Sequence, residues 1–413
     1  MKEVFETAKH APDVKISSEI VGRNRQKRAI FFVFDGGTGL GHLRRLSCIA
    51  RHLQGDFACL LVTGHRAAAN WFVPPECEYV HVPAWDSLLA EKAAYWSRKP
   101  FLEGSPNAVT EFRRQMLQGI VKAFQPDIII VDHLPLGMRE ELSSIIEHTP
   151  CLKYLVTRAI QNETENLDRL LLTGPARQAI ELFYHRVFVA VDEQVFDLCL
   201  QYPQLADLSE KFSTVGYVVE PVPASHISEY RNERGVSAND IWAVASACGG
   251  QHGEQLIEAS CNLALRFPQV TFDVVIGPRS NLPRDNIGGI NSPPPNLRMH
   301  RELPDLAHLH AAADIVISSG GYNSLLEALQ GNARILCVPS RKDERDEQYV
   351  HATKLGRYAP IDVSIDVHQL PLMFENAIEA LDRGAPPDNR KLLNITGAAN
   401  IKRMIENDLG MAE

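Results

Sequence analysis

Short apolar runs alternate with amphipathic stretches along most of the chain from Ala29 onward. Runs of this kind are typical of strands that are buried on both faces. The stretches between them have the length and spacing of helices, and the repeat of strand, helix and strand predicts a parallel sheet. In the first half the expected strands are 29–34, 57–63, 78–82, 127–132, 151–156 and 186–191, the expected helices lie at about 42–54, 108–124, 137–147 and 173–184, and 83–106 is expected to be irregular.

The alternation stops at 217–238, where Gly216-Tyr-Val-Val-Glu-Pro-Val-Pro223 leads into a polar stretch without a strand pattern. We therefore expect a domain boundary there. The pattern then restarts, with strands expected at 241–247, 271–277, 297–300, 314–318, 334–338 and 357–361 and helices at 367–382 and 390–408. This organisation predicts an α/β fold with two doubly wound Rossmann-like domains and a cleft between them. Its expected parts are an N-terminal arm 1–28, an N-terminal domain 29–220, a C-terminal domain 221–385, and a final helix within 386–413 that packs back on the N-terminal domain.

Composition narrows the class of protein. The 413 residues are 45% hydrophobic and 23% charged, which is typical of a soluble globular chain with two or three domains. The net charge of −9 gives no electrostatic footprint for nucleic acid. The 8 Cys include no C-x-x-C pair and are interpreted as reduced thiols, and no apolar run approaches the length of a membrane span. A cytoplasmic enzyme is the expectation.

The first of the glycine-rich turns is Phe34-Asp-Gly-Gly-Thr-Gly-Leu-Gly-His-Leu-Arg-Arg45, between the first strand and the first helix. Its glycines allow the backbone to approach a ligand closely, and the amides at the helix start favour an anion. A purely structural turn is the alternative. No Gly-Lys-Ser/Thr follows, and no acidic residue is placed after Thr63 for a ribose, which disfavours a P-loop and a dinucleotide site.

Two further turns lie in the second half. Val244-Ala-Ser-Ala-Cys-Gly-Gly-Gln-His-Gly253 occupies the position in the second domain that the first turn has in the first, so the two are expected to face each other. The stretch Asp314-Ile-Val-Ile-Ser-Ser-Gly-Gly-Tyr-Asn-Ser-Leu-Leu-Glu-Ala-Leu329 combines a strand, a Ser/Gly turn and a helix. Backbone amides at 320–324 and the hydroxyls of Ser319 and Ser324 could hold a diphosphate. Glu327, one turn further along the helix, could accept both hydroxyls of a ribose, and a solvated helix glutamate is the alternative.

The third turn, together with 333–339 and 347–355, resembles the nucleotide-sugar half of GT-B glycosyltransferases. Within that class the chain resembles glycosyltransferase family 28, which includes the N-acetylglucosaminyltransferase that makes lipid II and whose first loop is similar to Asp35–His42. The resemblance implies a GT-B fold and transfer of a hexose or N-acetylhexosamine from a UDP-sugar. It implies no cofactor besides that donor substrate.

The resemblance also implies a donor site. Gly320, Gly321 and Ser324 would bind the diphosphate, and Glu327 would bind the ribose. Gln348 would contact the sugar, although the charged stretch before it, 340–347, departs from the family pattern. Uracil is the favoured base, with dTDP left open. The full set of expected donor-binding residues is Gly41, Gly250, Gln251, Leu303 (at the nucleobase), Ser319, Gly320, Gly321, Asn323, Ser324, Glu327 and Gln348.

The N-terminal domain receives the acceptor in this fold. The residues expected on that side are Gly37, Thr38, Gly39, Arg45 and Trp96. Arg44 and Arg45 follow the first glycine turn. Their side chains could pair with a diphosphate or with an anionic acceptor, and a solvated helix face is the alternative. The acceptor itself is left open between a small molecule, a saccharide and a lipid-linked molecule, and Arg98 and Lys99 are thin support for membrane contact.

Glycosyl transfer needs a base for the acceptor hydroxyl. We predict that His42 is this base and that Asp132, at the end of a strand in the same domain, orients its imidazole. The alternative makes His133 the working group. No Asp-x-Asp pair or His/Cys cluster at metal-ligand spacing occurs, so no metal ion is expected.

Three other functions use the same pattern. The Gly-x-Gly-His-x-x-Arg sequence around His42 also resembles the UDP-sugar hydrolase of pseudaminic acid synthesis, in which water replaces the acceptor. A nucleotide-sugar 2-epimerase is disfavoured because its acidic catalytic residues cannot be placed here. A non-catalytic nucleotide-sugar-binding subunit is the remaining alternative.

Overall fold

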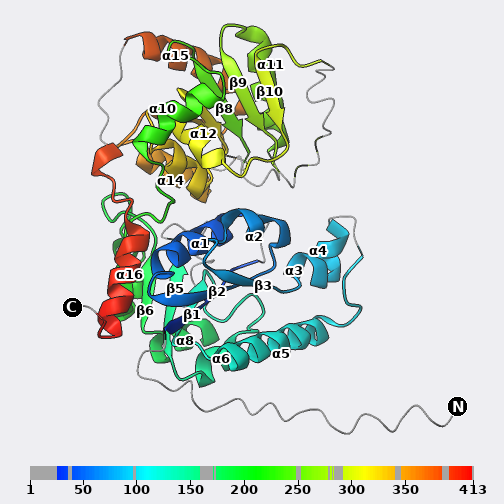
Figure 1. The fold of residues 1–413 in the computed structure, drawn as a ribbon, viewed down its shortest axis with the longest axis vertical. Helices are drawn as coiled ribbons and strands as arrows, with labels where there is room; N and C mark the ends of the chain where they lie inside the picture. Colours follow the sequence, from blue (N-terminus) through cyan, green and yellow to red (C-terminus); the bar gives the residue numbers. More distant parts are fainter. Residues whose placement is uncertain are drawn as a thin grey trace, which may run out of the picture.

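The apolar runs of the sequence form two separate parallel sheets in the computed structural model, one in each of two domains that are stacked end to end (Figure 1). The structure describes residues 26–35, 40–95, 99–158, 171, 174–247, 253–277, 280, 282, 292–339, 346–383 and 390–411.

The N-terminal domain contains a seven-stranded sheet in the order β3-β2-β1-β4-β5-β6-β7. Its strands are β1 (Lys27–Phe32), β2 (Phe57–Thr63), β3 (Glu78–His81), β4 (Ile128–Asp132), β5 (Leu152–Thr157), β6 (Arg186–Val189) and β7 (Phe212–Thr214). The helices are α1 (Gly41–Leu53), α2 (Arg66–Phe72), α3 (Trp85–Leu88), α4 (Ala90–Tyr95), α5 (Pro106–Phe124), α6 (Ser143–His148), α8 (Gly174–Leu182), α9 (Leu198–Gln201) and the 3-10 helix η3 (Pro203–Lys211).

The C-terminal domain contains a six-stranded sheet in the order β10-β9-β8-β11-β12-β13. Its strands are β8 (Trp242–Ser246), β9 (Thr271–Val275), β10 (Leu297–His300), β11 (Ile315–Ser318), β12 (Arg334–Cys337) and β13 (Ile361–Val363). The helices are α10 (Ala224–Glu233), α11 (Glu254–Arg266), α12 (Leu306–Ala312), α13 (Tyr322–Ala328), α14 (Glu347–Leu355), η4 (Val367–Gln369), α15 (Leu370–Arg383), η5 (Arg390–Leu392) and α16 (Gly397–Asp408).

Strand order brings distant residues to one edge of each sheet. β1 pairs with β4 in parallel, with Phe32 opposite Val131. The start of α1 therefore lies beside the carboxyl end of β4. In the other domain β8 pairs with β11, with Ser246 opposite Ser318. Ligands of such folds bind at the switch point, which is the place at the carboxyl ends of the parallel strands where the strand order reverses. The order reverses between β1 and β4 in one sheet and between β8 and β11 in the other. Residues that follow β1 and β11 line one pocket, so both switch points lie at the space between the domains.

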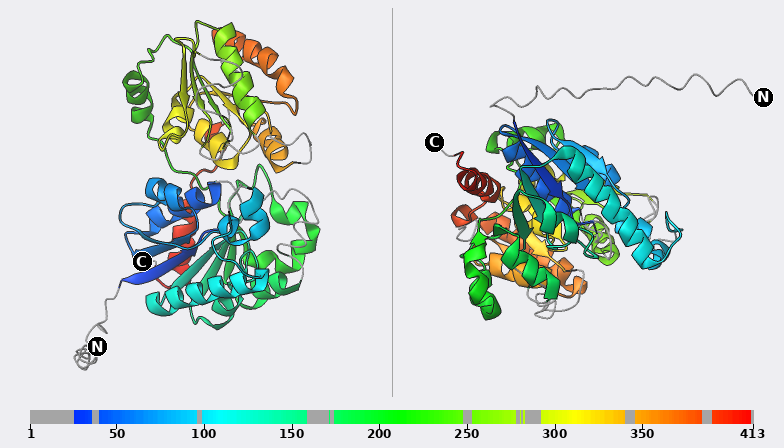
Figure 2. Two further views of the ribbon diagram at one scale, coloured as in Figure 1. Left: turned by 90° about the vertical axis from the view of Figure 1, so that its right-hand side faces the viewer. Right: turned by 90° about the horizontal axis from the view of Figure 1, so that it is seen from below.

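The last helix, α16, crosses back to the first domain. Ala398, Ile401 and Ile405 share an apolar cluster with Leu46 and Ile49 of α1. Figures 1 and 2 show the red C-terminal helix alongside the blue and green elements of the N-terminal domain, far in sequence but adjacent in space. At the end of the helix, Asp408 accepts two hydrogen bonds of 2.8 Å from Arg186 on β6.

The predicted α/β class with two parallel sheets is confirmed. Two local expectations were wrong. The short edge strand β7 was not expected, because three residues carry too little pattern to identify a strand. The interval 83–106, expected to be irregular, contains α3 and α4 and begins α5. The interval 217–238, where a domain boundary is expected, contains α10.

Candidate active site

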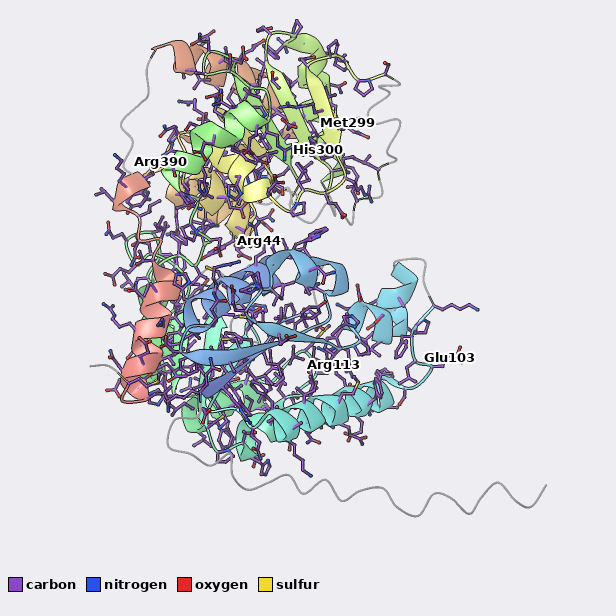
Figure 3. The ribbon with its side chains drawn as sticks, viewed as in Figure 1. Arg44, Glu103, Arg113, Met299, His300 and Arg390 are labelled. Atoms are coloured by element: carbon purple, nitrogen blue, oxygen red, sulfur yellow. The ribbon has the colours of Figure 1, made fainter. Side chains whose placement is uncertain are left out.

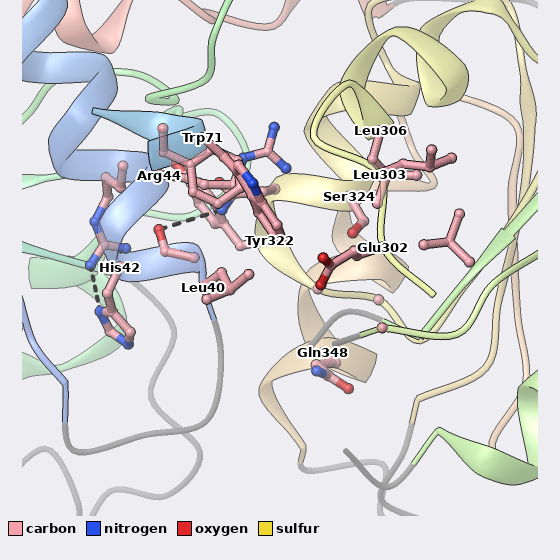
Figure 4. Close-up of a pocket in the computed structure, with 18 of the residues that line it drawn as sticks. Leu40, His42, Arg44, Trp71, Glu302, Leu303, Leu306, Tyr322, Ser324 and Gln348 are labelled. Carbon is pink, nitrogen blue, oxygen red and sulfur yellow. Dashed lines mark hydrogen bonds between the residues drawn. The ribbon is translucent and has the colours of Figure 1, made fainter. Parts of the chain in front are cut away.

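A pocket of about 240 Å³ lies between the two domains. The N-terminal domain contributes the start of α1 and the end of α2 to the pocket wall. The C-terminal domain contributes the turns before α12 and α13 and the first residues of α13 and α14. In Figure 4, His42 and Arg44 extend from one side, and Leu303, Ser324 and Gln348 from the other. The lining residues are Leu40, Gly41, His42, Arg44, Arg45, Trp71, Phe72, Arg158, Val275, Gly277, Glu302, Leu303, Pro304, Leu306, Gly320, Gly321, Tyr322, Asn323, Ser324, Glu347, Gln348 and His351.

His42 is in contact with Asp132. The imidazole lies near the start of α1, the carboxylate is buried at the end of β4, and Nδ1 is 2.6 Å from Oδ2. Since an ionised carboxylate only accepts, this contact places the proton of a neutral imidazole on Nδ1 and leaves the Nε2 lone pair available. The structure thus brings together the two residues of the predicted dyad.

Charges around the dyad favour a neutral base. Burial alone would raise the pKa of Asp132, but Arg45 and His42 outweigh it and hold that pKa below its usual value. Burial lowers the pKa of His42, and it outweighs the opposing effect of Asp132, while Arg45 and Arg158 lower the pKa further. At neutral pH the arrangement is an ionised Asp132 beside a neutral imidazole, which can accept a proton.

Arg45 is in contact with the dyad. It is expected on the acceptor side, and its burial excludes the alternative of a solvated helix face. Its side chain is only 3% exposed, and its guanidinium forms an ion pair with Oδ1 of Asp132. One helical turn separates Arg45 from His42, so both reach the same carboxylate. Arg45 therefore supports the dyad, and it also lines the pocket.

His133, the alternative base, is buried beside the dyad with a backbone φ of +69°. Its ring centroid lies 5.3 Å from that of His42 and 5.0 Å from that of Phe34. Within the described part of the chain its Nδ1 has no hydrogen-bond partner. Burial lowers the pKa of His133 well below its ordinary value. His42 has the carboxylate contact that His133 lacks among these residues, and it is the better candidate.

The third glycine turn forms part of the opposite wall. Gly320 has φ +80°, and a Cβ there would lie 2.7 Å from Cys337 Sγ, so a larger residue would be strained. Gly320, Gly321, Asn323 and Ser324 all line the pocket. Ser319, expected to hold the diphosphate through its hydroxyl, is buried and is not among the residues that line the pocket.

Two backbone segments meet across the domains near this turn. Asn323 Nδ2 is 3.4 Å from the carbonyl oxygen of Gly41, and a Cβ on Gly41 would lie 3.2 Å from the same nitrogen. The Tyr322 hydroxyl donates to the carbonyl of Ala190 at 2.8 Å. Gly41 and Asn323, both expected at the donor site, are thus brought into contact.

Glu327 is not the solvated residue of the alternative reading. Its side chain is 1% exposed, its Oε2 is 2.9 Å from His310 Nδ1, and its Oε1 is in an ion pair with Arg44 (Figure 3 locates Arg44 between the domains). Glu327 is not among the residues that line the pocket, whereas its partner Arg44 is. Sequence spacing could not indicate the partner Arg44, which lies in the other domain.

Gln348 lines the pocket at the start of α14. Asp346 caps this helix, because its Oδ1 accepts a hydrogen bond of 2.8 Å from the backbone N–H of Gln348. The neighbouring Glu347 forms an ion pair with Arg158, which follows β5 in the other domain, and Glu347 Oε2 is 2.5 Å from Arg158 Nη1. Burial raises the pKa of Glu347, against the effect of Arg158. Sequence reasoning missed Arg158, because nothing local marks it as a pocket residue.

Leu303, the expected contact of the nucleobase, lines the pocket with Pro304 and Leu306. Facing them from the N-terminal domain are Trp71 and Phe72 at the end of α2, which sequence reasoning also missed. The combination gives this end of the pocket an apolar character that suits a planar base.

Several expected residues lie outside the described part of the chain. These are Gly37, Thr38 and Gly39 of the first turn, Gly250 and Gln251 of the second, and Trp96. Among the residues that are described, no group of three or more His, Cys, Asp or Glu side chains is placed to hold a metal ion. No helix in the same ranges is long and apolar enough to span a membrane.

Two Rossmann-like domains, each with its switch point on a shared pocket and with a C-terminal helix crossing back, define the GT-B architecture. Residues 248–400 match the glycosyltransferase family 28 C-terminal domain. A curated relative, an uncharacterized glycosyltransferase from Methanosarcina acetivorans, is 21% identical over 414 residues, covering 92% of this chain and 98% of the relative.

Solved structures show the same fold. The kitacinnamycin glycosyltransferase has a TM-score of 0.58 at 13% identity, with 94% of this chain and 100% of the other covered. The calicheamicin glycosyltransferase CalG4 has 0.57 at 16%, with 94% and 99% covered. A putative UDP-N-acetylglucosamine 2-epimerase from Listeria monocytogenes has 0.60 at 11%, with 94% and 98% covered. The predicted GT-B fold and the resemblance to family 28 glycosyltransferases are confirmed.

Proposed function

We propose that this protein is a glycosyltransferase that moves a hexose or N-acetylhexosamine from a UDP-sugar to an acceptor hydroxyl without a metal ion. The observation that carries the proposal is the His42–Asp132 contact of 2.6 Å, located on the pocket wall opposite Gly320 and Ser324. A base and a diphosphate-sized glycine turn across one cavity are what this reaction requires.

In the proposed reaction the acceptor O–H donates its proton to His42 Nε2 as the oxygen bonds to the anomeric carbon. The bond from that carbon to the diphosphate oxygen breaks, and UDP leaves with the electron pair. Asp132 accepts the hydrogen bond from the Nδ1–H of His42 and stabilises the imidazolium that forms, while the buried Arg45 keeps Asp132 ionised.

The remaining residues would position the donor. Gly320, Gly321 and Ser324 line the pocket and would bind the diphosphate, and the Gly320 backbone N–H, which donates to the Ser318 hydroxyl at 3.1 Å, would have to change partner to take part. Leu303 would contact the base, Glu327 would bind the ribose hydroxyls, and Gln348 would contact sugar hydroxyls.

The test combines binding and turnover. UDP, dTDP, GDP, ADP and NAD are compared as ligands by calorimetry, and UDP release from UDP-N-acetylglucosamine and UDP-glucose is then followed with small-molecule, saccharide and lipid-linked acceptors. Transfer that requires an acceptor and is lost in His42→Ala supports the proposal. UDP release with water alone, unaffected by any acceptor, would identify a hydrolase, and binding without release would identify a non-catalytic subunit.

A further inference from the structure

Arg44 joins the two domains through a buried carboxylate. It extends from α1 in the N-terminal domain and forms an ion pair with Oε1 of Glu327 on α13 of the C-terminal domain. The two side chains are 18% and 1% exposed. The guanidinium carbon also lies 5.0 Å from the centroid of the Phe72 ring, which holds the arginine along the pocket wall.

The other oxygen of Glu327 is already engaged. His310 Nδ1 is 2.9 Å from Oε2, and the Ser246 hydroxyl is 3.0 Å from His310 Nε2. All three side chains are buried. A neutral His310 that donates to Glu327 can accept from Ser246, so this chain fixes Oε2 and the orientation of the carboxylate. No well-directed hydrogen bond reaches Oε1, which faces only the Arg44 guanidinium in the described structure.

Oε1 is therefore the oxygen that a ribose bound at Glu327 must use, and Arg44 occupies it. Removing Arg44 from a carboxylate that is 1% exposed is unfavourable unless other hydrogen bonds replace it. Ribose hydroxyls can donate to Glu327 in place of Arg44, but the displaced guanidinium then needs another anion. The diphosphate of the donor is such an anion. Arg44 could reach it, because Arg44 lines the same cavity as Gly320 and Ser324, the residues expected to bind the diphosphate.

The other two arginines of the pocket wall have different partners. Arg45 is paired with Asp132, and Arg158 with Glu347. Neither of those carboxylates is expected to bind the ribose. Among these three arginines, only Arg44 has a partner that the donor itself would take over.

We propose that Arg44 exchanges partners when the donor binds. It leaves Glu327 Oε1 to the ribose and, from its place in the N-terminal domain, pairs with the diphosphate of the donor. The inference rests on the proposed function and assigns Arg44 as a donor-binding residue. A nucleoside without phosphate must break the ion pair with no compensation. Arg44 thus makes the pocket select a nucleoside diphosphate over the nucleoside alone.

The test measures the dissociation constants of uridine and UDP by calorimetry for wild type, Arg44→Gln, Arg44→Lys and the control Arg51→Gln. Arg51 lies on the same helix and pairs at 2.8 Å with Glu220, both side chains being 39% exposed. In Arg44→Gln we expect tighter uridine binding, weaker UDP binding, and a fall of about tenfold or more in the preference for UDP. Arg44→Lys should keep more of the preference than Arg44→Gln, and Arg51→Gln all of it.

The outcomes separate the two proposals. If wild type binds UDP but Arg44→Gln keeps the full UDP preference, with uridine binding no tighter, the partner exchange is overturned and the proposed function stands. If wild type does not bind UDP, the proposed function is overturned and the exchange with it. Thermal unfolding of each variant verifies that it is folded, and the conservative Arg44→Lys variant supplies the comparison if Arg44→Gln is not.

Discussion

Replacing Asp132 by asparagine should damage both stability and turnover. Asp132 Oδ2 accepts a hydrogen bond from His42 Nδ1 at 2.6 Å, and Oδ1 neutralises Arg45, whose side chain is 3% exposed. Asparagine is nearly the same size but carries no charge, so Arg45 would remain buried without a counter-ion. Breaking such a pair costs about 3–5 kcal/mol.

The effect on turnover has a separate origin. Without the carboxylate, the imidazolium that forms in the reaction loses its stabilising charge, and the rate should fall by about 10²- to 10⁴-fold. Because Asp132 raises the pKa of His42 against the effect of burial, its loss should lower that pKa further. The acidic limb of the rate profile, which lies below pH 6.5 in the wild type, should move to still lower pH in Asp132→Asn.

Urea unfolding and initial rates of UDP release, measured from pH 5 to 8, check both effects. The matched control is Asp362→Asn, since Asp362 pairs at 3.2 Å with Arg334 but is 45% exposed, and its loss should cost less than about 1 kcal/mol. His42→Ala leaves the Asp132–Arg45 pair intact and should lose activity with a smaller loss of stability than Asp132→Asn. Asp132→Asn with wild-type turnover, or with the stability of the control, would refute the reasoning.

Three other predictions follow from the structure. Burial lowers the pKa of His351 to about 4, so the unfolded chain binds a proton more strongly than the folded one between pH 4 and 6.5. The free energy of unfolding should therefore fall by about 3 kcal/mol as the pH drops through that range. In urea titrations at several pH values, His351→Gln should show a smaller fall. Ile401 of α16 is fully buried against α1, so Ile401→Ala should lower the free energy of unfolding by about 2–5 kcal/mol, whereas Leu392→Ala, at a 60% exposed side chain, should change it little. EDTA should leave the rate of UDP release unchanged, and restoration of a lost rate by added Mg²⁺ or Mn²⁺ would contradict the metal-free mechanism.

Sequence reasoning works where the chain's own periodicity sets the structure. The buried strands β1 and β4 are continuous apolar runs, and their pairing places His42 beside Asp132 although 90 residues separate them. A parallel sheet with its order reversing at β1 makes that contact foreseeable. The glycine turn at Gly320 is foreseeable for a similar reason, since its φ of +80° favours glycine.

Contacts between domains could not be predicted in this way. Arg44 pairs with Glu327, and Arg158 with Glu347, only because two independently folded sheets approach at one particular distance and angle. No repeat or spacing within one domain encodes that approach. Trp71 was missed for the same reason, because a residue at the end of a short helix becomes a pocket residue only when the second domain faces it.

The most direct test of the central claim is thermal unfolding with UDP, since it needs no acceptor. A ligand that binds only the folded state at 100 times its dissociation constant stabilises it by about 2.7 kcal/mol. The account predicts that UDP stabilises the wild type more than GDP, ADP or NAD does, and that Glu327→Gln loses most of this stabilisation. The absence of stabilisation by any pyrimidine nucleoside diphosphate would contradict a UDP-sugar site between the domains.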